Sequence, residues 1–169
     1  MIKRVVCLMI SLMLCSCINK VPLIKNSNEG IDPRLIGKWV DKKNKENEKI
    51  LIFKFSDNEY FVKIDLNSEP WYYKMYIVKV EDIKYLQLQL IGSDKIYPNE
   101  NTKDNKNLTD DFFVLKYEII NSEIKIDSMF VSGGNEIDSA KLLDLFKKSL
   151  KNNDKGMFKA LNNVLIKAD

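Results

Sequence analysis

Histidine is missing from this chain and cysteine is confined to its first residues, which together exclude most catalytic chemistry. Among 169 residues there is no histidine, and the three cysteines are Cys7, Cys15 and Cys17. Histidine is the usual general base and the commonest zinc ligand, and a cysteine thiol is a common nucleophile. We therefore predict that the protein is not an enzyme and that it has no catalytic residues, no metal site and no cofactor.

Paired carboxylates are the chemistry that these absences leave open. Asp57 with Glu59, or Asp110 with Asp111, could act on glycosides if their carboxyl groups lay about 5–10 Å apart across a cleft. Each pair falls in a predicted turn or loop, where solvated charge is the simpler interpretation. The loop around Asp110 also lacks the glycine turn and terminal glutamate of a calcium site.

No apolar run in the sequence is long enough to span a bilayer, since a spanning helix needs about 20 apolar residues. The most apolar run, residues 5–14, follows Lys3 and Arg4 and is followed closely by the small residue Ser16. A basic start, a short apolar run and a small residue before the cleavage site are the pattern of a secretory signal. The pattern predicts export from the cytoplasm.

The stretch Leu14-Cys15-Ser16-Cys17 resembles the lipobox of bacterial lipoproteins, which has leucine three places before the modified cysteine and a small residue directly before it. The resemblance implies that residues 1–16 are a signal peptide and that lipid, a diacylglycerol thioether with an acyl chain such as palmitate on the freed amine, is attached at Cys17. Two chains hold a protein stably on a membrane, whereas one does not. The implied location is the cell envelope, with the outer membrane favoured in a two-membrane envelope because Ile18 and not aspartate follows Cys17.

Removal of residues 1–16 from the 169 leaves 153 residues, the size of a single domain. That part has 25 basic and 24 acidic residues, because Lys3 and Arg4 are lost from 27 basic residues. So small a net charge gives no reason to expect nucleic acid as a partner. Residues 17–33 contain Asn, Lys, Pro and Gly without a sustained period, so we predict a disordered lipidated tether and a folded domain at 34–169.

Period-two alternation of apolar residues predicts a run of antiparallel strands. Leu86, Leu88 and Leu90, for example, alternate with Gln87 and Gln89, which predicts one buried and one wet face. Consecutive strands with short turns favour a mainly β fold, either an up-and-down barrel or a strongly curled meander. The predicted strands are 35–40, 49–55, 59–65, 71–80, 83–91, 112–120 and 123–131.

Amphipathic helices are predicted at the carboxyl end, over about 136–166. Asp138 and Ser139 can cap a first helix whose leucines recur every three or four residues, with lysines on its other faces. A second, shorter helix is predicted over 155–166. The lysine-rich face of the first helix could contact a membrane, although a helix packed on the sheet with solvated lysines is the simpler interpretation.

At Gly37-Lys38-Trp39 the chain resembles the lipocalins, which begin their first strand with Gly-x-Trp and then form an up-and-down barrel with a late helix. The resemblance implies that Gly37 lets the strand bend and that Trp39 plugs the closed end of the barrel. The family also stacks an arginine near its last strand on that tryptophan. This chain has only Arg4 and Arg34, so that partner is missing.

Two functions remain open at this point. If the barrel is hollow, inward aromatic side chains would bind a small apolar ligand, and the predicted ligand-binding residues are Trp39, Trp71, Tyr73, Phe113 and Tyr117. If the barrel is filled, outward Tyr72 and Tyr76 would form a contact patch. The polar loop 92–111 would then make the protein an interaction module, such as an inhibitor, an envelope assembly factor or a host-contact factor.

Overall fold

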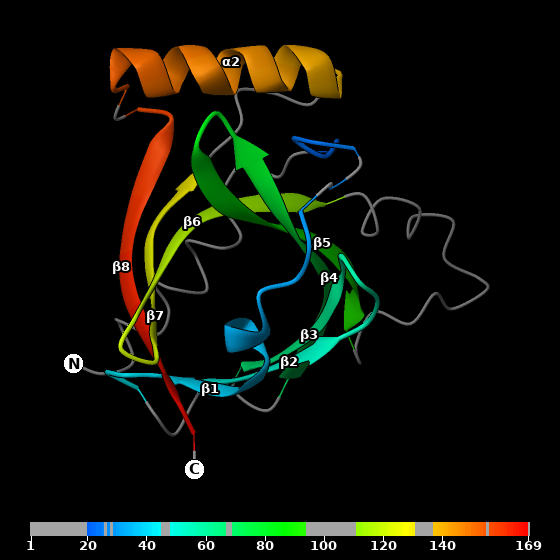
Figure 1. Ribbon diagram of the computed structural model, residues 1–169, viewed down its shortest axis with the longest axis vertical. Helices are drawn as coiled ribbons and strands as arrows, with labels where there is room; N and C mark the ends of the chain where they lie inside the picture. Colours follow the sequence, from blue (N-terminus) through cyan, green and yellow to red (C-terminus); the bar gives the residue numbers. More distant parts are fainter. Residues whose placement is uncertain are drawn as a thin grey trace.

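Eight antiparallel strands follow one another around a closed barrel, and β8 pairs back onto β1 (Figure 1). This computed structural model describes residues 20–25, 27, 29–44, 48–66, 69–93, 111–130, 137–154 and 156–168. Closure satisfies the strand edges that an open sheet would leave unpaired. The strands are β1 (Gly37–Asp41), β2 (Glu48–Lys54), β3 (Tyr60–Leu66), β4 (Glu69–Val80), β5 (Ile83–Ser93), β6 (Phe112–Ile120), β7 (Glu123–Phe130) and β8 (Phe158–Lys167).

The predicted fold class is confirmed: the chain forms the mainly β up-and-down barrel that the lipocalin resemblance implies. All seven predicted strands are present, with ends that differ by two residues or fewer. The first strand begins at Gly37 because residues Pro33–Leu35 form a short 3₁₀ helix, η1. Gly37 has a φ of 140°, which L side chains rarely adopt, so glycine is required at this bend.

The second carboxyl-terminal helix, predicted over 155–166, is wrong, because Phe158–Lys167 form strand β8 instead. Phe158, Leu161, Val164 and Leu165 have helical spacing in the sequence. In the structure two residues of β8, Leu161 and Asn162, lie opposite the single Asp127 of β7, and Asn162 has a φ of 50°. This bulge adds one residue to the strand, so its period-two pattern is broken and resembles a helical one.

The first helix is confirmed as α2 (Ser139–Asn152). The Asp138 side chain caps it by accepting a hydrogen bond from the Lys141 amide at 2.8 Å. At the other end Asn153 takes a left-handed conformation, which lets its amide bond back to the last turn.

The structure differs from the predicted tether, because several of the residues that it describes between 20 and 33 pack against the barrel or bond to it. Leu23 is 1% exposed, and the Ile24 amide and carbonyl both bond to the Gln87 side chain, at 3.1 and 3.0 Å. Ile31 packs against the barrel interior. Apolar residues in a lysine- and asparagine-rich stretch thus pack on the barrel, and the described part of this stretch belongs to the domain.

Two hydrophobic clusters use the two faces of the barrel wall. The interior cluster contains inward side chains from all eight strands, such as Trp39, Tyr60 and Met75. The outer cluster lies between the outward side chains of β4–β8, helix α2 and residues 21–24, and includes Phe130 and Phe146. The face of β5 that was predicted to be wet is therefore covered in part: Gln87 is 2% exposed.

Candidate ligand-binding site in the barrel

The amino-terminal segment crosses one end of the barrel and shuts it (Figure 1). The Ile31 amide donates to the carbonyl of Asp57, in the β2–β3 turn, at 3.2 Å. Leu35 of η1 is fully buried against the interior cluster. We call residues 29–36 the plug.

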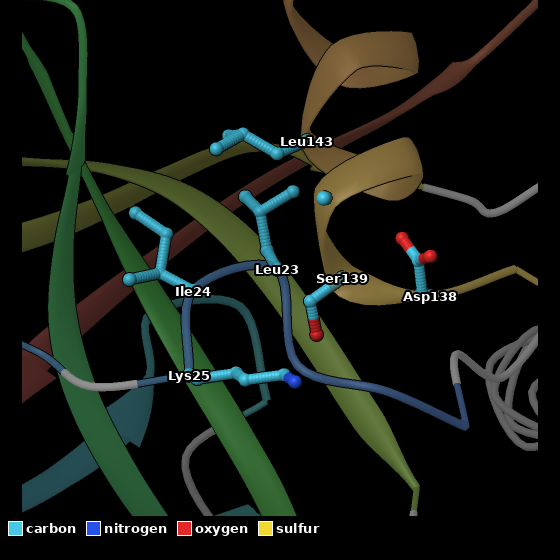
Figure 2. Close-up of a pocket in the computed structure, with 7 residues that line it drawn as sticks. Leu23, Ile24, Lys25, Asp138, Ser139 and Leu143 are labelled. Atoms are coloured by element: carbon cyan, nitrogen blue, oxygen red, sulfur yellow. The ribbon is translucent and has the colours of Figure 1, made fainter.

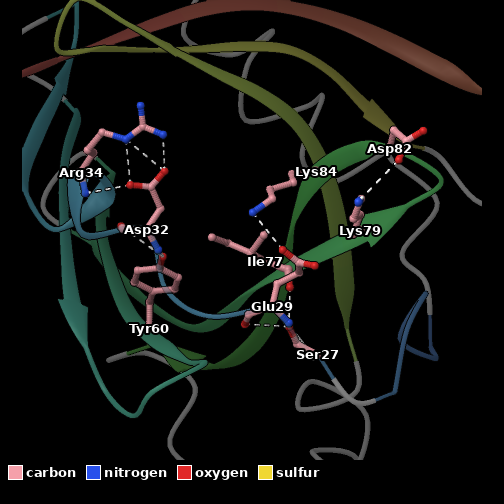
Figure 3. A network of polar contacts seen from close by, with 9 residues as sticks. All are labelled: Ser27, Glu29, Asp32, Arg34, Tyr60, Ile77, Lys79, Asp82 and Lys84. Atoms are coloured by element: carbon pink, nitrogen blue, oxygen red, sulfur yellow. Dashed lines mark hydrogen bonds and ion pairs between the residues drawn. The ribbon is translucent and has the colours of Figure 1, made fainter.

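The Tyr60 hydroxyl and the ion pair between Glu29 and Lys84 hold the plug in place, and a second ion pair lies within it (Figure 3). The Tyr60 hydroxyl accepts a hydrogen bond from the Asp32 amide. It also donates a hydrogen bond to the Asp32 carbonyl at 3.2 Å. The Arg34 guanidinium bonds the Asp32 carboxylate at 2.6 Å and lowers the pKa of that carboxyl. Glu29 is bonded by Lys84 of β5 at 2.9 Å, which lowers the pKa of Glu29. The plug is therefore tied to β3 and β5.

Trp39 lies directly under the plug. It is 1% exposed, and its Nε1 donates to the Leu35 carbonyl at 2.8 Å. The Lys167 ammonium, at the end of β8, lies 5.5 Å from the centre of the indole ring. A cation from the last strand thus stacks on this tryptophan as the lipocalin resemblance implies, with lysine in place of arginine.

Tyr117 belongs to the same closed end. Burial raises its pKa to about 12, and the nearby Asp32 carboxylate acts in the same direction. Burial also raises the pKa of Tyr60 to about 12. Both hydroxyls therefore stay protonated over the physiological range, as neutral hydrogen-bonding groups facing the plug.

The opposite end of the barrel carries inward apolar side chains that keep some solvent access. Tyr73 of β4 and Phe113 of β6 contact edge to face, with ring centres 6.2 Å apart. Trp71, Ile64 and Ile50 lie side by side across β4, β3 and β2 in the strand register, and Ile50 is paired in turn with Trp39 of β1. Phe113, Trp71 and both isoleucines are only partly buried, although they pack on the interior cluster. We call Ile64, Trp71, Tyr73 and Phe113 the mouth.

All five predicted ligand-binding residues belong to the interior cluster or pack against it. The structure divides them into two groups: Trp71, Tyr73 and Phe113 lie at the mouth, whereas Trp39 and Tyr117 lie at the closed end. Ile50 and Ile64 were not among the predicted site residues. Ile64 alternates with charged Lys63 and Asp65, which is the signal of an inward-facing residue, but only the strand register brings it between Ile50 and Trp71.

The predicted contact loop 92–111 lies largely outside the described residues, as does the predicted lipidation site Cys17. The two ends of the loop are ordered. Gly92 and Ser93 complete β5, and Asp111 is 3% exposed and bonds the Lys20 ammonium at 2.5 Å. This ion pair ties the first described residue of the chain to the start of β6.

A hollow of about 500 Å³ lies outside the barrel between residues 23–25 and the first turns of α2 (Figure 2). Its walls are mostly apolar, with Leu23, Ile24 and Leu143 on them. The Ser139 hydroxyl is buried there without a hydrogen-bond partner in the described part of the chain.

Within the described ranges, no three Asp, Glu, His or Cys side chains come close enough together to bind a metal ion. The Asp57 side chain is fully exposed and paired with Lys54 at 2.9 Å, so it is a solvated turn residue. None of the described helices has the length and apolar character to cross a membrane.

Comparison of this chain with protein-family models, with curated proteins and with solved structures finds no match. The fold and the two ends of the barrel are therefore what any functional assignment rests on.

Proposed function

We propose that this protein is a non-catalytic lipoprotein of the bacterial cell envelope, anchored at Cys17, whose barrel binds a small apolar ligand at the mouth. The supporting observation is the group of inward apolar side chains at the mouth. Ile64, Trp71 and Phe113 are partly buried and pack against the interior cluster beside the buried Tyr73. Apolar concave sites with a few polar groups are the usual form of a small-molecule site.

The two tryptophans make this proposal testable, since Trp71 lies at the mouth and Trp39 at the closed end. Trp39→Phe and Trp71→Phe each leave one reporter. Titration with the apolar fluorophore N-phenyl-1-naphthylamine should quench Trp71 in the first variant and leave Trp39 much less affected in the second. Equal quenching of both, or no saturable binding, would contradict a site at the mouth. Native mass spectrometry of the purified protein should also reveal a co-purifying apolar molecule.

The anchor has its own test. Cys17→Ser should leave the chain uncleaved or release it from the membrane fraction, because no acyl chain could then be attached. Unchanged membrane attachment of a processed Cys17→Ser chain would remove the anchor from the proposal without affecting the ligand site.

An interaction module is the second candidate, and exposed aromatic residues on the outer wall of β2–β4 favour it. Phe53 and Phe55 are 50% and 62% exposed, and Phe61 contacts Tyr72 with ring centres 5.9 Å apart. Exposed apolar patches of this kind mark contact sites. A pull-down from intact envelopes should compare the wild type with Phe53→Ser and with a chain lacking 93–110. Loss of a specific partner in either variant would support this function and identify the surface used.

A further inference from the structure

The amino-terminal segment leaves the folded domain beside helix α2. Leu23 packs in the outer cluster with Leu142 and Phe146 of α2. Residues 23–25 and the first turns of α2 face the same hollow (Figure 2). Lys20 is fixed to the wall by its ion pair with Asp111.

The chain between the proposed lipid and this wall is very short. Two residues, Ile18 and Asn19, separate Cys17 from Lys20, and the three steps along an extended chain span at most about 11 Å. A tether of 17 residues, as the sequence suggests for 17–33, would leave the domain free to rotate above the membrane. So short a connection holds the side of the barrel that carries Lys20 and α2 close to the lipid surface.

The outward face of α2 has the charge that such a surface attracts. Lys141, Lys147, Lys148 and Lys151 are exposed. Asp144 is the acidic residue among them and pairs with Lys148 at 2.8 Å, so four lysines against one aspartate leave three net positive charges. The apolar face of α2 is not available for insertion, because Leu142 and Phe146 are fully buried on the barrel.

We infer that the lysine face of α2 lies on the anionic headgroups of the membrane in which the chain is anchored. This inference rests on the proposed anchor at Cys17. The contact is electrostatic and does not insert the helix. Three net charges favour this orientation on the order of 100-fold over one with α2 turned away. Phe53, on the outer wall of β2, lies four strands from β6 in the ring, and so faces away from the lipid.

Because Cys17 is consumed by lipid and the other cysteines precede it, a single introduced cysteine reports its own surroundings. Asp144→Cys reports the face of α2 and keeps all four lysines. Phe53→Cys reports the far wall. The lipidated chain is placed in phosphatidylcholine vesicles with or without phosphatidylglycerol, and its reaction rate with a membrane-impermeant polyethylene-glycol maleimide is measured. An intact mass on the same sample shows whether Cys17 carries lipid.

We expect Asp144→Cys to react at least about tenfold more slowly in the anionic vesicles than in detergent, with the protection lost at high salt. Phe53→Cys should react equally fast in both. Changing the four α2 lysines to Gln should abolish the protection while the protein stays membrane-bound. The matched control changes Lys49, Lys54, Lys63 and Lys74 to Gln, and this variant should keep the protection of Asp144→Cys.

Equal rates at the two cysteines in anionic vesicles, or protection that survives the α2 lysine changes, would overturn the inference. An unmodified Cys17 by mass would instead overturn the proposed anchor. The two failures are therefore distinguishable on one sample.

Discussion

The interior and outer hydrophobic clusters are built from opposite faces of the same strands, and they differ in what covers them. The interior cluster is enclosed mainly by the barrel itself, since each strand contributes side chains to it, and Leu35 of the plug closes one end. The outer cluster needs α2 and residues 21–24, which come from the two ends of the described chain. A barrel wall can thus hold apolar residues on both faces when segments outside the sheet cover the second face.

Loss of an aromatic ring from the outer cluster tests whether the two clusters unfold as one unit. Phe146 is fully buried and contacts three rings, those of Tyr85, Phe130 and Phe158, at 4.7–5.7 Å. Phe146→Ala should lower the free energy of unfolding by about 3–5 kcal/mol. Urea denaturation followed by fluorescence and by circular dichroism measures it. Met75→Ala is the matched interior change and should shift the same transition. A separate early transition in Phe146→Ala alone would mean that the outer cluster is an independent layer.

The amino-terminal segment gives the sharpest contrast with the sequence prediction. Leu23→Ala should lower the free energy of unfolding by about 3 kcal/mol, because Leu23 is a buried core residue. Ile120→Ala, at a site 46% exposed, should change it by no more than about 0.5 kcal/mol. If urea denaturation shows equal, small effects of both changes, the segment around Leu23 is a disordered tether, as the sequence predicts.

Alkaline pH tests the interior cluster through its tyrosines. Burial raises the pKa of Tyr60, Tyr73 and Tyr117 to about 12, against about 10 in an unfolded chain. The stability that each protonated tyrosine contributes to the fold is fully present below pH 10 and is lost as the pH rises towards 12. The loss is on the order of 2–3 kcal/mol for each tyrosine. Urea midpoints measured across this range should fall steeply. Tyr60→Phe should make the fall shallower, and an unchanged profile in that variant would contradict the assignment.

Gln87 joins the outer face of β5 to the amino-terminal segment. Of the four predicted changes in the free energy of unfolding, its substitution should have the smallest effect. Gln87→Leu keeps a similar volume but leaves the Ile24 amide and carbonyl without their partner, at a cost of about 1–2 kcal/mol. Combined with Leu23→Ala in a double-mutant cycle, it should show coupling, because both changes act on one segment. Strict additivity would mean that Gln87 and Leu23 stabilise the fold independently.

The sequence predicts the barrel well where the alternation of apolar residues is unbroken. Leu86, Leu88 and Leu90 all face the interior as expected. It fails at β8, where the bulge at Asn162 breaks the alternation. A bulge depends on pairing with a distant strand, so local pattern gives no sign of it.

The covered outer wall could not be predicted for a similar reason. Gln87 reads as a surface residue, and its burial depends on a segment more than sixty positions away. Within the candidate site, alternation along the strands alone predicts that the aromatic residues of the mouth face inward. The cation on Trp39 did not, because Lys167 lies in the strand that was taken for a helix.

The most direct test of this account is hydrogen exchange at the Ile24 amide, measured by NMR on the purified domain. The amide donates to Gln87, and Leu23 beside it is buried in the outer cluster. If residues 20–25 belong to the fold, this amide should exchange as slowly as those of the neighbouring barrel strands and only through large unfolding events. Exchange at the rate of an unstructured chain would contradict the account, because the segment would then be a free tether.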